Sequence, residues 1–310
     1  MKQKIILDCD PGHDDAIALL LAARHPALEL LAVTTVAGNQ SLEKTTRNAL
    51  KVCALAGIRD IPVARGMERP LVRPPRYAAD IHGESGLDGP QIPETDLEPV
   101  TQHAVDLLID LLLASDGDIV LVPTGPLTNI AAAIRREPAI VSKIQAISLM
   151  GGAMGLGNTT PGAEFNIWCD PEAAAIVFGC GRPITMVPLE VTHQALATGE
   201  IIERLRASGR RVAGIVADLL LFFAATYRDV FGFDAPPVHD PCAVAAVIDP
   251  TIVEARPMRV EIEMASEWCD GRTVCDVYNT GKREPNARVG YGLDNARFWD
   301  LVLETIISYD

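Results

Sequence analysis

The chain has 310 residues, of which 48% are hydrophobic, so it is long enough to bury a large core. Lys and Arg number 27 and Asp and Glu 41, which gives a net charge of −14 and argues against general binding to nucleic acid or to an anionic membrane. No uninterrupted apolar run reaches the ~18 residues of a membrane span.

The first predicted elements surround a cluster of acids. Residues 5–7 form an apolar run typical of a buried strand, a Pro-Gly turn follows at 11–12, and residues 16–23 predict a helix. Four carboxylates therefore fall within eight residues at a strand-to-helix turn: Asp8, Asp10, Asp14 and Asp15.

Packing gives no reason for this cluster, because neighbouring carboxylates repel one another and raise each other's pKa values. One or two Asp residues at a helix start are usually N-caps, but four exceed what capping needs. The helix N-terminus stabilises each anion by only ~0.3–1 kcal/mol. A bound cation would stabilise the cluster more, and hard oxygen ligands favour Ca²⁺ or Mg²⁺.

The remaining elements alternate strand and helix. Strands are predicted at 28–36, 61–64, 118–122, 144–150 and 184–187. Helices are predicted at 41–56 with Ser41 as N-cap, 101–114, 126–136 with Pro126 in the first turn, 170–180 begun by Asp170, 198–205, 211–227, 242–247 and 294–309. Residues 259–264 and 272–278 predict a β-hairpin. This order predicts one α/β domain over residues 1–310: a single open, mostly parallel sheet flanked by helices, with a Rossmann-like core and a late β-hairpin.

Two long segments, 66–100 and 151–169, interrupt this alternation and are predicted as loops. Loops of this length in a compact domain are usually functional or disordered, but the residues of 66–100 taken alone favour a polar surface loop. The turn at 123–126 lacks the Lys of a phosphate loop, which argues against nucleoside triphosphate binding.

Seven cysteines without a C-x-x-C pair predict reduced thiols in a cytoplasmic protein. Cys269 and Cys275 could pair across the predicted hairpin, but we expect them reduced. Residues 1–4 lead directly into a short strand, so we expect no signal peptide.

Polar residues follow the predicted strands, where open α/β sheets bind their ligands. The candidates are Asp8, Asp10, Asp14, Asp15, Asn39, Thr124, Met150, Asn158, Glu164, Phe165 and Asn166, with His239 and Asp240 opening a late helix. This set contains no obvious Ser-His nucleophile and no Lys for a Schiff base. Carboxylates and amides suit a neutral polyhydroxylated ligand held by a hard cation.

These motifs resemble the nucleoside hydrolase family, the inosine–uridine-preferring N-ribohydrolases, over essentially the whole chain. The signature is the segment 8–15, Asp-Cys-Asp-Pro-Gly-His-Asp-Asp, supported by Met-Gly-Gly-Ala at 150–153, Glu-Phe-Asn at 164–166 and His-Asp at 239–240. Residues 82–89, His-Gly-Glu-Ser-Gly-Leu-Asp-Gly, look most like the bacterial pyrimidine-preferring ribonucleoside hydrolases. The resemblance implies Ca²⁺-dependent hydrolysis of the N-glycosidic bond of ribonucleosides, with uridine and cytidine expected ahead of inosine.

The resemblance also implies residue roles. Ca²⁺ would be held by Asp10, Asp15, the backbone carbonyl of Thr124 and Asp240, with water and the ribose diol completing the shell. Asp10 would be the general base that activates a calcium-bound water. Substrate would be bound by Asp14, Asn39, His82, Met150, Asn158, Glu164, Phe165, Asn166, Tyr227, His239 and Asp240. Among these, Asp14, Asn166 and Asp240 would hold the ribose diol, and Asn158 and Glu164 the 5′-hydroxyl.

On the base side, His239 is either the acid that protonates the leaving base or a substrate contact, and His82 and Tyr227 would lie beside the base. Asp8 would orient the turn, and His13 and His193 are expected to be structural. The family's usual assembly implies a homo-oligomer, a tetramer or a dimer.

Two other functions remain open at this stage. Asp-x-Asp at 8–10 also resembles the start of haloacid-dehalogenase phosphatases, which bind Mg²⁺, although Gly12 replaces the expected Thr or Val and Asp14 and Asp15 would have no role. The second alternative is a non-catalytic nucleoside- or ribose-binding protein, against which the single-domain pattern and the expected absence of a signal peptide argue.

Overall fold

The computed structural model describes residues 2–310. Met1, the first residue of the segment in which we expected no signal peptide, lies outside them. The strands are β1 (Gln3–Cys9), β2 (Leu28–Thr35), β3 (Val63–Arg65), β4 (Ile119–Pro123), β5 (Ile144–Met150), β6 (Ile184–Val187), β7 (Val253–Met258), β8 (Val260–Ile262), β9 (Thr273–Cys275) and β10 (Ala287–Leu293). The helices are α1 (His13–Arg24), α2 (Leu42–Leu55), α3 (Ala79–His82), α4 (Ala104–Ala114), α5 (Thr128–Arg136), the 3-10 helix η1 (Pro138–Lys143), α6 (Phe165–Cys169), α7 (Pro171–Phe178), α8 (Leu189–Thr192), α9 (Gly199–Ala207), α10 (Arg211–Phe231), α11 (Asp240–Ile248) and α12 (Asn295–Ile307).

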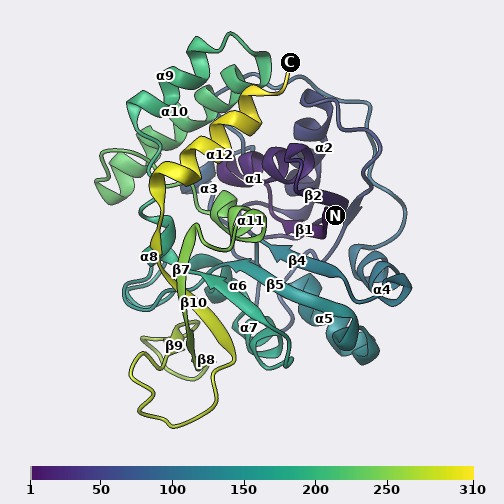
Figure 1. Ribbon diagram of the computed structural model, residues 1–310, viewed down its shortest axis with the longest axis vertical. Coiled ribbons are helices and arrows are strands. Elements are labelled where there is room, and N and C mark those ends of the chain that lie inside the picture. Colours follow the sequence, from purple (N-terminus) through teal and green to yellow (C-terminus); the bar gives the residue numbers. More distant parts are fainter. Residues whose placement is uncertain (1) are drawn as a thin grey trace.

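An eight-stranded sheet in the order β3-β2-β1-β4-β5-β6-β10-β7 forms the centre of the fold (Figure 1). All neighbouring pairs are parallel except β10 and β7, which are antiparallel at one edge. Helices α1, α2 and α9 to α12 pack on one face, and α4, α5 and α7 pack on the other. The open, mostly parallel sheet flanked by helices is therefore confirmed.

Strand β1 illustrates why the sheet needs both helical layers. Ile5 and Leu7 belong to the core under α1, whereas Ile6 between them belongs to the core under α4 and α5. Alternate side chains of a strand point to opposite faces, so a strand buried on both sides reads as a continuous apolar run.

The order of the strands reverses at β1: β2 and β3 lie on one side, and β4 and β5 lie on the other. A crevice opens at such a switch point, outside the carboxyl ends of the strands. The acid-rich turn after β1 and Thr124 after β4 both lie at this point, since Thr124 donates its backbone N–H to the Asp8 oxygen over 2.8 Å.

Several element boundaries differ from the prediction. Strands β5 and β6 match the predicted residues, but α5 begins at Thr128 rather than at Pro126, and α10 continues to Phe231. Ser41 stands at the N-cap of α2 without a side-chain hydrogen bond, whereas the Asp170 carboxylate caps α7 by accepting from the Ala173 amide. Helices α3 and α6 lie inside the two segments predicted as loops, and α8 was not predicted.

The predicted hairpin is confirmed in a shorter form, in which Val260 pairs with Cys275 and Ile262 with Thr273 in a separate two-stranded sheet. Strands β7 and β10, which complete the main sheet, were missed. All seven cysteines are free in the structure, Cys269 and Cys275 included.

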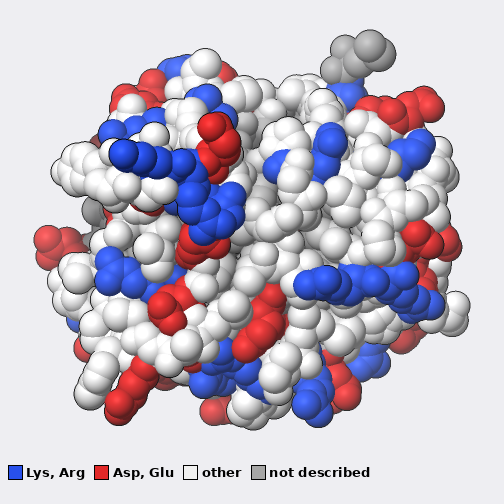
Figure 2. Space-filling model, turned by 90° about the horizontal axis from the view of Figure 1, so that it is seen from below, with Lys and Arg blue, Asp and Glu red and all other residues white. Residues whose placement is uncertain are grey.

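Within residues 2–310, no helix combines the length and the apolar character that crossing a membrane requires. Figure 2 shows that basic side chains on the face seen from below form short runs separated by acidic and uncharged ones. That face offers no broad basic surface for a polyanion, which agrees with the net charge of −14.

Candidate active site

A cavity of about 280 Å³ lies at the switch point of the sheet, near the lower end of the ~300–1,000 Å³ range of ligand pockets. Twelve of the predicted site residues line it: Asp14, Asn39, His82, Thr124, Met150, Asn158, Glu164, Phe165, Asn166, Tyr227, His239 and Asp240. Asp10 and Asp15 are fully buried beside it. Residues from nearly the whole length of the chain are thus brought to one place.

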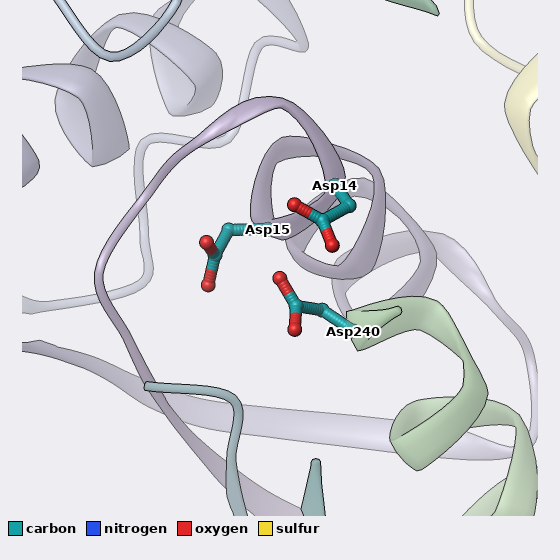
Figure 3. Close-up of side chains that lie close together, drawn as sticks. All are labelled: Asp14, Asp15 and Asp240. Atoms are coloured by element: carbon teal, nitrogen blue, oxygen red, sulfur yellow. The ribbon is translucent and has the colours of Figure 1, made fainter. Parts of the chain in front are cut away.

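Three carboxylates converge on one point at this cavity. Oxygen atoms of Asp14, Asp15 and Asp240 all lie within 4.8 Å of one another. Asp14 and Asp15 come from the first turn of α1, and Asp240 begins α11 (Figure 3). The sequence-based metal set contains two of these three residues, because Asp14 was assigned to substrate binding.

Asp10 lies next to this cluster in a tight backbone enclosure. Its Oδ2 accepts a hydrogen bond of 2.6 Å from the Asn39 amide, and its Oδ1 is buried without a partner among the described residues. A Cβ added at Gly38 or at Gly125 would stand 2.1 Å or 2.4 Å from the Asp10 oxygens. Glycine at both positions is therefore required for the carboxylate to fit.

Asp15 is held by donors from three segments. Its Oδ2 accepts from the Gly12 amide over 3.0 Å and from the Asn39 side chain over 3.1 Å. Its Oδ1 accepts from the Thr124 hydroxyl over 2.9 Å. These bonds fix the carboxylate between the loops that follow β1, β2 and β4. Asp14 Oδ2 accepts from the His239 amide over 3.1 Å, which ties the start of α1 to the start of α11.

Burial raises the pKa of every carboxylate in this cluster, and like charges raise several of them further. The pKa of Asp14 rises to about 7 through burial and then through Asp15. Burial and then Asp15 raise the pKa of Asp10 well above its ordinary value, and burial and then Asp14 do the same for Asp240. Ionising these buried carboxylates without a counter-charge is unfavourable, and a buried oxygen without a hydrogen-bond partner lies beside them. This arrangement fits a divalent cation bound by oxygen ligands.

Asp8 lies inside β1 and away from the cavity. Its Oδ1 accepts from the Thr34 hydroxyl over 2.6 Å and from the Asn129 amide nitrogen over 2.7 Å. Burial raises the pKa of Asp8 to about 7. These two bonds tie the end of β1 to β2 and α5.

The segment around α6 forms the opposite wall. The Glu164 carboxylate accepts from the backbone amides of Gly152, Asn166 and Ile167, so it caps α6 as well as facing the cavity. Burial raises the pKa of Glu164 to about 7. Asn166 donates from Nδ2 to the Thr124 carbonyl oxygen over 2.7 Å, which places this amide beside the predicted metal ligand. Asn158 Oδ1 accepts from the Phe165 amide over 3.0 Å.

His239 stands between two hydroxyl groups. Its Nδ1 lies 2.8 Å from the Thr192 hydroxyl and its Nε2 lies 2.6 Å from the Tyr227 hydroxyl. Burial, and then the nearby His193, hold the pKa of His239 well below its ordinary value. Tyr227 and His239 both line the cavity, so this hydrogen-bonded pair faces any molecule bound there. His193 lies edge-on to His239 and packs against it, as expected of a structural residue.

His82 also lines the cavity and is buried against His13 and Phe223, the ring on which Tyr227 packs from another side. Burial lowers the pKa of His13 to about 4 and holds that of His82 well below its ordinary value. Burial therefore favours the neutral form of both rings.

Several lining residues were not found from the sequence: Tyr77, Ala78, Asp80, Ile81, Thr159, Trp168, Phe223, Val230 and Phe231. Tyr77 and Trp168 lie in or next to the two segments without periodicity, so no pattern identified them. Phe231 lies in the last turn of α10, beyond the predicted end of that helix.

Comparisons with known proteins agree on one group. Residues 5–300 match the family model described as inosine-uridine preferring nucleoside hydrolase. The chain is 47% identical over 308 residues to the pyrimidine-specific ribonucleoside hydrolase RihB of Escherichia coli strain K12 / DH10B, covering 99% of this chain and 98% of the relative. A plant nucleoside hydrolase, PpNRh1, superposes with a TM-score of 0.93 at 34% identity, covering 99% of this chain and all of the other. The purine-preferring ribonucleoside hydrolase from Gardnerella vaginalis superposes with a TM-score of 0.92 at 34% identity, covering 98% of each chain.

Proposed function

The chain belongs to the inosine-uridine preferring nucleoside hydrolase family and is a ribonucleoside hydrolase. On that premise we propose that the enzyme depends on Ca²⁺ and hydrolyses uridine and cytidine to ribose and free base. The observation that carries this proposal is the convergence of Asp14, Asp15 and Asp240 beside the partnerless Oδ1 of Asp10. Family membership sets aside the phosphatase and the non-catalytic binding protein.

The cation would be held by Asp10, Asp15, the Thr124 carbonyl and Asp240. All of these donors are oxygens, which a hard cation such as Ca²⁺ prefers. The raised pKa values of Asp10 and Asp240 show how unfavourable the uncompensated cluster is. When bound, the cation would lower the pKa of a water molecule and hold the ribose diol.

Asp10 would act as general base. Its Oδ2 is occupied by the Asn39 amide, so the free Oδ1 is the atom that takes the proton from the attacking water. The water then adds to C1′ of the ribose as the bond to the base breaks.

The ribose would be oriented by polar groups on both walls. Asp14, Asn166 and Asp240 hold the 2′- and 3′-hydroxyls, Asn158 and Glu164 hold the 5′-hydroxyl, and Asn39 lies on the sugar side. Breaking an N-glycosidic bond builds positive charge on the sugar, as in O-glycoside hydrolysis. The acid cluster stabilises that charge because its geometry is fixed before the reaction.

The leaving base needs a proton, and His239 with its Tyr227 partner would supply it. The 2.6 Å contact between His239 Nε2 and the Tyr227 hydroxyl lets the two act as one unit at the cavity. Tyr227 was expected only to lie beside the base, and this contact gives it a chemical partner.

The proposed pyrimidine preference rests on sequence identity. The chain is 47% identical to the pyrimidine-specific relative and 34% identical to the purine-preferring one. We further propose one domain over residues 1–310, a homotetrameric or homodimeric assembly and a role in pyrimidine salvage in the cytoplasm. The seven free thiols fit a reducing compartment.

A substrate panel tests the function. Purified protein is incubated with uridine, cytidine and inosine, and ribose release is measured with calcium present and after calcium removal. The proposal predicts release from uridine and cytidine ahead of inosine, and only with calcium. Equal release with and without metal would overturn the calcium dependence, and faster release from inosine would overturn the base preference. Phosphate release from p-nitrophenyl phosphate with Mg²⁺ serves as a negative control.

A further inference from the structure

Two histidines meet at the cavity wall, and the catalytic steps proposed above use neither of them. His82 ends α3 and His13 begins α1, and their Nδ1 atoms lie 3.2 Å apart. Nε2 of His13 lies 2.8 Å from the backbone oxygen of Asp88. His82 faces the cavity, whereas His13 is fully buried behind it. The contacts of His13 decide which nitrogen of His82 carries its proton.

The Asp88 carbonyl oxygen can only accept a hydrogen bond, so the proton of His13 belongs on Nε2. The His13 ring stacks between Phe222 and Phe223, at 5.1 and 5.2 Å, and has no carboxylate among its described hydrogen-bond partners. A charge there would be buried without compensation, so the ring is neutral. Its Nδ1 then carries a lone pair, and the Nδ1 of His82 must be the donor between the two rings.

One contact favours the opposite arrangement. The backbone N–H of His13 points at Nδ1 of His82 over 3.3 Å and would be satisfied by an unprotonated Nδ1. If Nδ1 of His82 is unprotonated, each tautomer of His13 meets a repulsive contact. With the His13 proton on Nε2, the two Nδ1 lone pairs face each other at 3.2 Å. With the proton on Nδ1, the Nε2 lone pair faces the Asp88 oxygen at 2.8 Å. The amide belongs to the first turn of α1, where backbone donors have no partner within the helix. Leaving the His13 amide without this 3.3 Å hydrogen bond costs less free energy than placing two lone pairs against each other at 3.2 Å or 2.8 Å.

The loop after His82 is built to hold the Asp88 carbonyl in place. The Asp88 carboxylate accepts from the backbone amides of Glu84 and Ser85, over 2.9 and 3.1 Å, and closes the loop on itself. Asn48 Nδ2 donates to the Ser85 oxygen over 2.8 Å and anchors the loop to α2. Gly83 has a φ of 77°, and a Cβ there would stand 2.2 Å from the Asp88 carboxylate, so glycine is required.

We propose, resting on the function proposed above, that His13 is a positioning residue that holds His82 in the tautomer protonated at Nδ1. Nε2 of His82 has no hydrogen bond among residues 2–310 and belongs to a side chain that lines the cavity. It therefore presents a lone pair to the substrate and accepts a hydrogen bond from an N–H group of the base, such as the imide of uracil or the amino group of cytosine. His82 does not supply the proton to the leaving base, which leaves that role to His239 and Tyr227.

The tautomer is measured directly by ¹⁵N NMR of the calcium-loaded protein labelled at histidine, since protonated and unprotonated ring nitrogens differ strongly in chemical shift. The chain has six histidines, and the spectrum of His82→Gln assigns the His82 ring. The proposal predicts a protonated Nδ1 and an unprotonated Nε2 on His82. A protonated Nε2 with an unprotonated Nδ1 would overturn it, and this result needs no variant at His13.

Two variants of His13 distinguish the effect of its hydrogen-bond acceptor from the effect of its side-chain volume. His13→Asn keeps an oxygen acceptor the same number of bonds from the backbone as Nδ1, whereas His13→Leu keeps bulk and loses the acceptor. We expect the Asn variant to retain the His82 tautomer and to bind uridine with a KM within about threefold of the parent. We expect the Leu variant to lose the fixed tautomer and to raise KM about tenfold or more, with a smaller change in kcat.

Equal effects of the two folded variants on KM and on the His82 spectrum would show that bulk alone matters and would overturn the proposal. The NMR result does not depend on turnover. A parent protein that holds the expected tautomer but hydrolyses no nucleoside would refute the proposed function and leave the positioning role of His13 intact.

Discussion

The backbone amide of Asn39 donates a 2.6 Å hydrogen bond to Oδ2 of Asp10, while Oδ1 of the same carboxylate has no partner among residues 2–310. One oxygen is thereby fixed by the loop that follows β2, and the other would, in the function proposed above, take the proton from water. This division explains how a fully buried carboxylate can be both rigid and available.

Replacement of Asp10 tests its role as base. Asp10→Ala should abolish turnover of uridine, and Asp10→Asn, which keeps the shape, should reduce kcat by about 10²–10⁴-fold. The fold and much of the ribose affinity should remain, because Asp14, Asn166 and Asp240 are unchanged. Circular dichroism and ribose binding by calorimetry provide the controls. Near-normal turnover by Asp10→Asn would remove Asp10 as the base.

Gly38 tests the enclosure around Asp10. A Cβ at this position would stand 2.1 Å from Asp10 Oδ2 and 2.7 Å from Cδ of Pro126, so Gly38→Ala must move the carboxylate. Since small misplacements of reacting groups cost about 10²-fold in rate, we expect a loss of that order in kcat. Gly199→Ala is the matched control, because a Cβ there meets nothing within 4 Å and kcat should not change. Equal kcat values for the two variants would argue against the enclosure.

His239 and Tyr227 are tested with leaving groups of different basicity. His239→Ala and Tyr227→Phe should slow uridine and inosine unequally, with losses of up to about 10²–10⁴-fold, because the two bases need protonation to different extents. A p-nitrophenyl riboside, whose leaving group needs no proton, should be hydrolysed nearly as fast as by the parent. If all three substrates slow by the same factor, His239 orients the substrate and does not protonate the base.

The buried acids make the metal-free protein sensitive to pH. Burial raises the pKa of Asp8, Asp14 and Glu164 to about 7 in the folded state, against ~4 in the unfolded chain. Stability from these groups is fully present below the unfolded pKa and is lost as pH rises through the folded pKa.

The melting temperature of metal-free protein should therefore be lower at about pH 8 than at about pH 5.5, and calcium should raise it more at the higher pH. Differential scanning calorimetry in both buffers, with and without calcium, measures this. A metal-free protein that melts higher at the higher pH would contradict the assignment of raised pKa values.

Strands β1 to β6 could be predicted from the sequence, and β10 and β7 at the far edge of the sheet could not. Strand β5 reads as a bounded apolar run because it is buried on both faces. Strand β10 contains Gly290 and Gly292, and β7 contains Pro257, residues that strand patterns usually exclude. A Pro is tolerated in β7 because the strand is at the sheet edge, which is a property of the assembled sheet and not of the segment.

The candidate site divides in a similar way. The acids, Asn166 and His239 follow predicted elements and could be found, since the carboxyl ends of parallel strands meet at one edge. Tyr77, Trp168 and Phe231 reach the cavity from segments without a periodic pattern or from beyond a predicted helix end. The contact between His13 and His82 joins residues 69 positions apart, and no spacing rule indicates it.

The most direct test of the central claim is to strip the protein of metal, titrate it with calcium, and measure bound calcium and ribose release from uridine in the same samples. The account predicts no release without metal and a rate that rises in proportion to bound calcium until a single ion is held per chain. Undiminished hydrolysis by stripped protein, or a calcium-loaded protein that leaves every nucleoside intact, would contradict it.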